Sequence, residues 1–345
     1  MARVRRGTNF SCEICAALGP LHACSACATV YYCGTVCQRE HWRVHKHECK
    51  DAAAAAFSRD LSEATAGDAW AQYNTALRLK EGRGVAPNAT EGLMWLRRSA
   101  EAGNAQAQYS LGVNYHLGRD VAADAVQAAA WWHRAAEAGS PEAQYNLGVC
   151  LCDGIGISAD AVQGVTWLRL AAEAGSLPAQ YNLGCCLRDG IGTSVNTLLA
   201  VVWLRRAAEA GYLPAQGTLG TCFLDGIGVA TDAVQAVAWF RRAAEAGESV
   251  AQYNLGWSYY MGKGVAVDHA EAVVWFRRAA EAGVPRAQFD LGVCLHKGHG
   301  VAVDRKQAAA WFRRAADAGN SDANRVLNKL CTASRCGHVV SVPTP

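Results

Sequence analysis

Apolar and polar positions recur every 36 residues over most of this chain, and seven full units fit between residues 67 and 318. Ala-Gln stands near the start of each unit, a tryptophan follows at a fixed distance, and a glycine closes the unit. A fixed period of this length is typical of stacked repeats, in which each unit buries its apolar face against its neighbours. The tryptophans are Trp95, Trp131, Trp167, Trp203, Trp239, Trp275 and Trp311, and the closing glycines are Gly103, Gly139, Gly175, Gly211, Gly247, Gly283 and Gly319.

Each unit predicts two helices. The first contains Leu-Gly and ends at a Gly-x-Gly turn such as Gly154 to Gly156. The second begins after Asp or Asn, which are preferred N-cap residues, and ends before the closing glycine. The Asp-x-x-Gln/Glu pattern at this start resembles a capping box, which Leu199 interrupts in the fourth unit. Arginines four residues before Glu or Asp predict exposed ion pairs along the second helices: Arg205, Arg241, Arg277 and Arg313 with Glu209, Glu245, Glu281 and Asp317.

The period, the Leu-Gly pair, the Gly-x-Gly turn and the ending Ala-Ala-Glu-Ala-Gly resemble the Sel1-like repeat, a relative of the tetratricopeptide repeat. The resemblance implies an all-α fold, a right-handed α-solenoid of helix-turn-helix repeats over residues 67–318. We expect a connecting helix at residues 50–66, a capping helix at 319–332 and a flexible tail at 333–345. A terminal repeat needs a polar outer face, and Asp322, Asn324, Arg325, Asn328 and Lys329 supply one.

Seven of the fifteen cysteines fall in pairs within residues 12–49, and a histidine completes the last pair. Ligands with two or three residues between them can hold one tetrahedral zinc ion, so eight ligands fill two closed, structural sites. A disulfide framework is the alternative for so many cysteines. It is disfavoured because the basic N-terminus leads into no apolar secretory signal. The ligands are Cys12, Cys15, Cys24, Cys27, Cys33, Cys37, His45 and Cys49.

The stretches Tyr32-Cys33-Gly34, Cys37-Gln38, Trp42 and His45-Lys46 resemble the MYND-type zinc finger. The resemblance implies a cross-brace that precedes the solenoid, which spacing alone does not select over a sequential pairing. In it, the first zinc takes Cys12, Cys15, Cys33 and Cys37, and the second takes Cys24, Cys27, His45 and Cys49. The resemblance also implies capture of short proline-containing peptides by the finger.

Two stripes on the first helices are expected to face the concave side of the solenoid, by analogy with tetratricopeptide arrays. One stripe is aromatic and the other is rich in amides, which can satisfy both donors and acceptors of an extended peptide. The alternative, that the tyrosines only pack between units, stays open. Gly217 interrupts the aromatic stripe and predicts a gap or a pocket. The predicted peptide-binding residues are Tyr109, Tyr145, Asn146, Tyr181, Asn182, Tyr253, Asn254 and Phe289.

Composition narrows the function further. The net charge is only +3, because the first 50 residues carry +4 and the rest of the chain is nearly neutral, and no apolar run is long enough to span a membrane. No catalytic motif is found, so we expect a cytoplasmic or nuclear interaction scaffold rather than an enzyme. The alternatives are a nucleic-acid-associated regulator that uses the basic finger, or an accessory subunit of a methyltransferase. A column of cysteines is expected to be small buried thiols rather than a disulfide ladder: Cys150, Cys186, Cys222 and Cys294.

Overall fold

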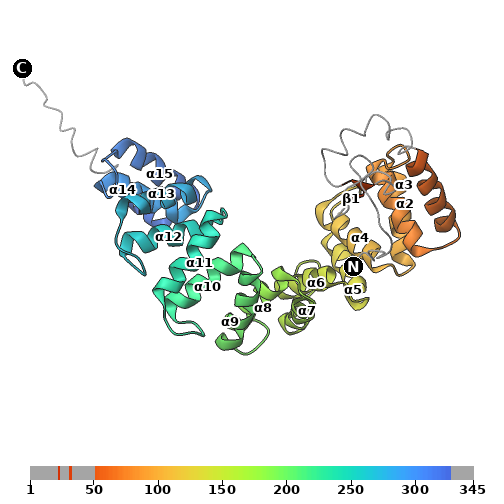
Figure 1. Ribbon diagram of the computed structural model, residues 1–345, viewed down its shortest axis with the longest axis horizontal. Coiled ribbons are helices and arrows are strands. Elements are labelled where there is room, and N and C mark those ends of the chain that lie inside the picture. Colours follow the sequence, from red (N-terminus) through yellow and green to blue (C-terminus); the bar gives the residue numbers. More distant parts are fainter. Residues whose placement is uncertain (1–21, 24–30, 33–50, 328–345) are drawn as a thin grey trace, which may run out of the picture. The chain divides into compact units, whose positions relative to one another are not determined.

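The computed structural model describes residues 22–23, 31–32 and 51–327 (Figure 1). Two compact units are divided between Trp167 and Leu168. Within the described residues, no helix combines the length and the apolar character that a membrane span requires. The only strands in this part of the chain are β1 (His22–Ala23) and β2 (Tyr31–Tyr32), which pair antiparallel.

The repeats are built from helices of equal length. After a helical segment at residues 51–65, the first unit contains α2 (Ala69–Glu81), α3 (Ala89–Glu101), α4 (Ala105–Leu117), α5 (Ala125–Glu137) and α6 (Pro141–Asp153). The unit boundary falls within α7 (Ala161–Glu173). The second unit contains α8 (Leu177–Asp189), α9 (Thr197–Glu209), α10 (Leu213–Asp225), α11 (Ala233–Glu245), α12 (Ser249–Met261), α13 (His269–Glu281), α14 (Pro285–Lys297) and α15 (Arg305–Asp317). The predicted helix-turn-helix repeats are confirmed.

The second helix of each repeat begins at its predicted cap, but the capping box is incomplete. Asp124 accepts hydrogen bonds from the backbone N–H groups of Val126 and Gln127. The N–H of Asp124 itself is already donated to the carbonyl of Tyr115 at 2.9 Å, so no side chain has to reach back to it. Asn196 caps the second helix of the fourth repeat in the same way, and its side-chain oxygen accepts from the N–H of Leu199 at 3.0 Å. The leucine therefore removes no contact there.

The recurring glutamine joins consecutive repeats. In all seven repeats the side-chain Nε2 of this glutamine donates a hydrogen bond to the backbone carbonyl eight residues earlier, at the end of the preceding helix. The distances are 3.0 to 3.3 Å. The same carbonyl also accepts from the N–H of the closing glycine, as Ala100 does from Gly103 at 3.1 Å, so the glutamine supplies a second hydrogen bond at the end of the helix. The glutamines are Gln72, Gln108, Gln144, Gln180, Gln216, Gln252 and Gln288, and all are buried.

The core of each repeat is centred one position after the recurring tryptophan. The residues at that position are buried throughout: Leu96, Trp132, Leu168, Leu204, Phe240, Phe276 and Phe312. Five of them face the glycine of the Leu-Gly pair in their own repeat: Trp132, Leu204, Phe240, Phe276 and Phe312. A Cβ on Gly220 would lie 2.6 Å from the ring of Phe240. Small and large side chains therefore alternate across the two helices of a repeat, as close packing requires.

The predicted ion pairs along the second helices are wrong, and two of their arginines stack on aromatic rings instead. The ion pairs within the described residues do not include the four predicted ones. Arg205 lies over the ring of Phe223 and Arg241 over that of Tyr259, in the first helix of the next repeat. The Nη2 of Arg241 also donates to the Tyr259 hydroxyl at 2.7 Å. A guanidinium stacked on a ring keeps its charge in water while its flat face is covered.

The helical segment at residues 51–65 packs as the second helix of a half repeat. The side chain of Gln72 donates to the carbonyl of Ala64 at 3.2 Å, which is the contact that joins consecutive repeats elsewhere. Arg78 pairs with Asp60 at 2.5 Å. The segment thus covers the apolar face of the first full repeat.

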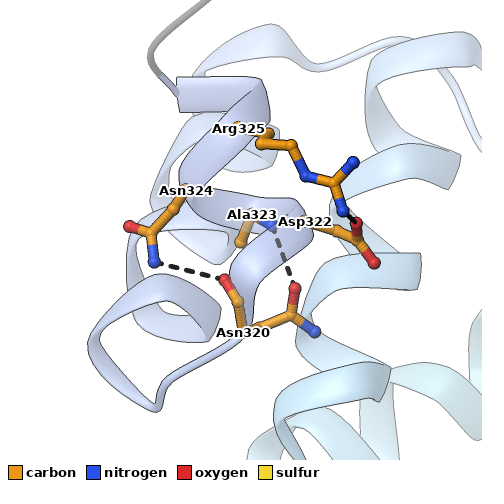
Figure 2. Close-up of polar contacts among 5 residues, drawn as sticks. All are labelled: Asn320, Asp322, Ala323, Asn324 and Arg325. Carbon is orange, nitrogen blue, oxygen red and sulfur yellow. Dashed lines mark hydrogen bonds and ion pairs between the residues drawn. The ribbon is translucent and has the colours of Figure 1, made fainter.

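The helical residues 321–327 cover the other end of the array (Figure 2). Asn320 caps this segment by accepting from the N–H of Ala323 at 2.9 Å, and the Nδ2 of Asn324 returns to the Asn320 carbonyl at 3.4 Å. Arg325 pairs with Asp322 at 2.6 Å. Ala323 is buried, whereas Asp322, Asn324 and Arg325 are exposed, in agreement with a polar outer face. The predicted positions 328 and 329 lie outside the described residues.

Candidate functional site

The eight predicted zinc ligands lie outside the described residues. Their chemistry fits zinc, because thiolate and imidazole are the ligands of closed tetrahedral zinc sites. Within the part of the chain that the structure describes, no group of three or more His, Cys, Asp or Glu side chains could hold a metal ion.

In the first compact unit, which ends at Trp167, the aromatic stripe is partly buried. Tyr109 and Tyr145 are half-buried, and Tyr73 of the preceding repeat is 9% exposed. The ring of Tyr109 packs against a core cluster that includes Trp132 and Leu147. Burial raises the pKa of the Tyr109 hydroxyl, and the charge of Glu142 adds to the effect. Packing between repeats and an exposed edge thus coexist at this position.

In the second unit, the aromatic stripe is likewise half-buried. The ring centroids of Tyr181 and Tyr212 are 5.6 Å apart, and those of Phe289 and Phe312 are also 5.6 Å apart. The hydroxyl of Tyr253 donates to a carboxylate oxygen of Asp290 at 3.1 Å. Burial raises the pKa of the Tyr253 hydroxyl, and the nearby charge of Asp290 raises it further. This tyrosine therefore remains a neutral hydrogen-bond donor.

The break in the aromatic stripe at Gly217 is occupied by a carboxylate. Gly217 is buried, and a Cβ built on it would lie 3.5 Å from an Oε2 atom of Glu248. Glu248 is held there because it caps α12, accepting from the N–H groups of Val250 and Ala251. The missing ring is thus replaced by an acidic group of the next repeat.

The amide stripe offers hydrogen-bonding groups without internal partners. Asn146 of α6, Asn182 of α8 and Asn254 of α12 are half-buried. Within residues 51–327, no hydrogen bond involves the side-chain amide of any of the three. Asp290 occupies the same column in the last repeat and is engaged by Tyr253. Each asparagine thus presents a free donor and a free acceptor beside an aromatic ring.

The cysteine column holds buried thiols, as predicted. Cys150, Cys222 and Cys294 are reduced and buried, and Cys186 is buried as well. Burial raises the pKa of Cys294 to about 11, and the charge of Asp290 contributes. A thiol with such a pKa is protonated at neutral pH and is a poor nucleophile or metal ligand.

A pocket of about 210 Å³ lies between the first and second repeats and was not predicted from the sequence. Tyr109 lines it together with Asp120, which follows α4. Asp120 has a φ of 60°. All other described residues with a positive φ are glycines. Aspartate stands there in a column that is otherwise glycine in every repeat, and this difference was visible in the sequence.

Two family models match the chain. The model of the Sel1 repeat matches residues 71–104, 105–140, 141–176, 177–212, 214–248, 249–284 and 285–320. The model of the MYND finger matches residues 12–49. The tandem matches cover most of the chain.

Solved structures and curated proteins also resemble parts of the chain. A protective antigen of uropathogenic Escherichia coli with an SLR fold is 35% identical, with a TM-score of 0.69 over 79% of this chain and 59% of that one. A Sel1 repeat protein from Oxalobacter formigenes is 31% identical, with a TM-score of 0.66 over 84% of this chain and 90% of that one. Both support the α-solenoid class.

Among curated proteins, a histone-lysine N-methyltransferase of Arabidopsis thaliana is 46% identical over 39 residues, which are 11% of this chain and 8% of the relative. A SET and MYND domain-containing protein of Dictyostelium discoideum is 57% identical over 30 residues, 9% of this chain and 6% of the relative. The chain thus spans less than a tenth of either curated relative. With the repeat model matched seven times, the chain belongs to the Sel1 repeat family and carries a MYND finger ahead of its repeats.

Proposed function

We propose that this protein is an interaction scaffold in which the finger and the repeats bind different segments of partner proteins. Membership of the Sel1 repeat family and the presence of a MYND finger support protein interaction as the general role. On this proposal, the finger captures short proline-containing peptides, and the repeats bind an extended peptide or a subunit of a complex.

The MYND finger implies zinc binding. We propose two structural ions, the first on Cys12, Cys15, Cys33 and Cys37 and the second on Cys24, Cys27, His45 and Cys49. Eight protein ligands leave no coordination position for water, so the ions would stabilise a binding surface rather than activate a substrate. A segment this short buries too little apolar surface to fold unaided, and metal binding would supply the missing free energy.

The unpartnered amides of Asn146, Asn182 and Asn254 are the observation that carries the proposal for the repeats. A half-buried amide without a hydrogen bond is unfavourable in the absence of water or a ligand. The backbone of an extended peptide offers both a donor and an acceptor to such an amide. The half-buried rings beside the amides, such as those of Tyr145 and Tyr253, would cover the apolar parts of the same peptide.

The test is a double substitution of two amides in the second compact unit, Asn182→Ala with Asn254→Ala, in the zinc-loaded full chain. Binding to an array of synthetic peptides is measured first for the wild type, and the affinity of each bound peptide is then measured for the variant. Losing two amide contacts at about 1 kcal/mol each predicts a roughly 30-fold weaker affinity.

The matched control is Gln235→Ala with Gln307→Ala, which removes two exposed amides from second helices of the same compact unit at the same spacing along the chain. The control should leave affinity unchanged. Equal affinities of the asparagine variant and the wild type, with unchanged helical content, would refute peptide binding through the amide stripe.

A further inference from the structure

Asp120 stands where the other repeats bring two backbones into close contact. In the next repeat this position is Gly156, and a Cβ built on it would overlap the carbonyl oxygen of Ala125, the first residue of α5. Gly84, Gly228, Gly264 and Gly300 make the same approach to the start of the preceding second helix. Only glycine permits it, because any Cβ would overlap backbone atoms that cannot move aside cheaply.

The second repeat cannot make this approach, because Asp120 carries a Cβ. Its counterpart across the junction is Ala89, the first residue of α3, and both residues line the 210 Å³ pocket. A turn that carries a Cβ at this position has to stay farther from α3 than the glycine turns stay from their partners, and the pocket lies at this junction between the first and second repeats.

The interior of the pocket is apolar. It is lined by Leu77 of α2, Leu93 and Leu96 of α3 and Val113 of α4. Leu77, Leu93 and Val113 remain half-exposed, so an apolar ligand group would remove their surface from water. Pockets for small organic ligands usually measure roughly 300–1,000 Å³. At 210 Å³ this pocket suits a single apolar side chain better than a whole cofactor or metabolite.

The rim of the pocket carries an unbalanced positive charge. Lys80, Arg119 and Asp120 all line it. The ammonium of Lys80 lies 3.6 Å from the Asp120 carboxylate, which balances these two charges. No ion pair within residues 51–327 involves Arg119, and its side chain is exposed. The rim therefore favours a ligand that brings a carboxylate close to Arg119.

We infer that the pocket binds one apolar side chain of a partner peptide that has a carboxylate next to it. The inference rests on the proposed peptide binding by the repeats, since Tyr109 belongs to both the pocket and the aromatic stripe. It adds a sequence preference, a medium-sized apolar residue such as leucine beside an acidic group. The carboxylate can come from an aspartate side chain or from the C-terminus of the partner.

The test uses acetyl-Leu-Asp-amide and the zinc-loaded full chain with labelled leucine and valine methyl groups, followed by NMR titration. The methyl resonances of Leu93, Leu96 and Val113 should shift. Acetyl-Gly-Asp-amide should bind about tenfold more weakly, because it lacks the apolar side chain. Acetyl-Leu-Asn-amide should bind about threefold more weakly, because it lacks the charge. Acetyl-Gly-Leu with a free C-terminus tests the second source of the carboxylate.

Two substitutions at one position separate the pocket from the rest of the fold. Asp120→Gly allows the close approach of the other repeats, so the pocket closes and the methyl shifts disappear. Asp120→Asn keeps a Cβ and a side chain that tolerates this backbone conformation, so the shifts persist.

Shifts that persist in the Asp120→Gly variant, or pocket methyl resonances that do not move in the wild type, would overturn the inference. Two residues are too short to span neighbouring repeats, which are spaced at roughly 8–10 Å. This titration therefore does not depend on Asn182 or Asn254, and it can fail while the peptide-array experiment succeeds, or the reverse.

Discussion

Gly156 offers a direct measurement of how much the close contact between repeats contributes to stability. Its φ is 68°, and a Cβ on it would overlap the carbonyl of Ala125. Gly139 has a φ of 85° but nothing lies within 4 Å of its Cβ position. Alanine at either position is strained by about 1–2 kcal/mol, partly offset by about 0.4–1 kcal/mol from a less flexible unfolded chain. Only Gly156→Ala adds an overlap between the new Cβ and the backbone of α5. Such an overlap costs about 1–3 kcal/mol more in a well-packed site.

We therefore expect Gly139→Ala to lower the free energy of unfolding by about 1 kcal/mol and Gly156→Ala by about 2–4 kcal/mol. Urea unfolding of the zinc-loaded chain, followed by far-ultraviolet circular dichroism, measures both variants against the wild type. Each repeat contacts only its neighbours, so the second substitution should also broaden the transition. Equal losses in the two variants would show that the turn is free to move away from α5. The close contact between the two backbones would then contribute nothing measurable to stability.

Two further predictions concern a carboxyl group and the metal. Burial raises the pKa of Asp290, so its stabilising contribution is present while the carboxyl is protonated and is lost as pH rises through the raised pKa. The Asp290→Asn variant should therefore have a higher free energy of unfolding than the wild type at pH 7, and the difference should vanish under acid conditions. A difference in urea unfolding that is equal at all pH values would contradict this. Chelation of zinc should unfold residues 12–49 and leave the helical signal of the repeats intact, and a chelated finger that keeps its hydrogen-exchange protection would contradict the zinc assignment.

The helices and turns could be predicted from the sequence because local geometry determines them. The closing glycines have φ values between 85° and 96°, as a left-handed residue after a helix requires. The second helices begin at Asp or Asn because those side chains reach an N–H group two or three residues ahead. The repetition of these signals seven times made the solenoid class predictable without any contact information.

The candidate sites could be predicted only in part. The aromatic and amide stripes were identified from their spacing, since positions 36 residues apart are equivalent in every repeat. Their chemical state depends on neighbours in other repeats. Tyr253 and Asp290 are 37 residues apart yet share a hydrogen bond, whereas Asn146 and Asn182 have no internal partner. The period alone cannot distinguish these cases.

By itself, the sequence determined the repeat, its helices and its caps, because those depend on residues within one or two turns of one another. Tertiary structure decided which column is buried, which arginines stack on rings such as that of Tyr259, and what the recurring glutamine binds. It also decided that Asp120 lines a pocket at a junction where the glycines of other repeats bring two backbones together. These outcomes depend on the distance between atoms of neighbouring repeats, and a sequence pattern does not contain that distance.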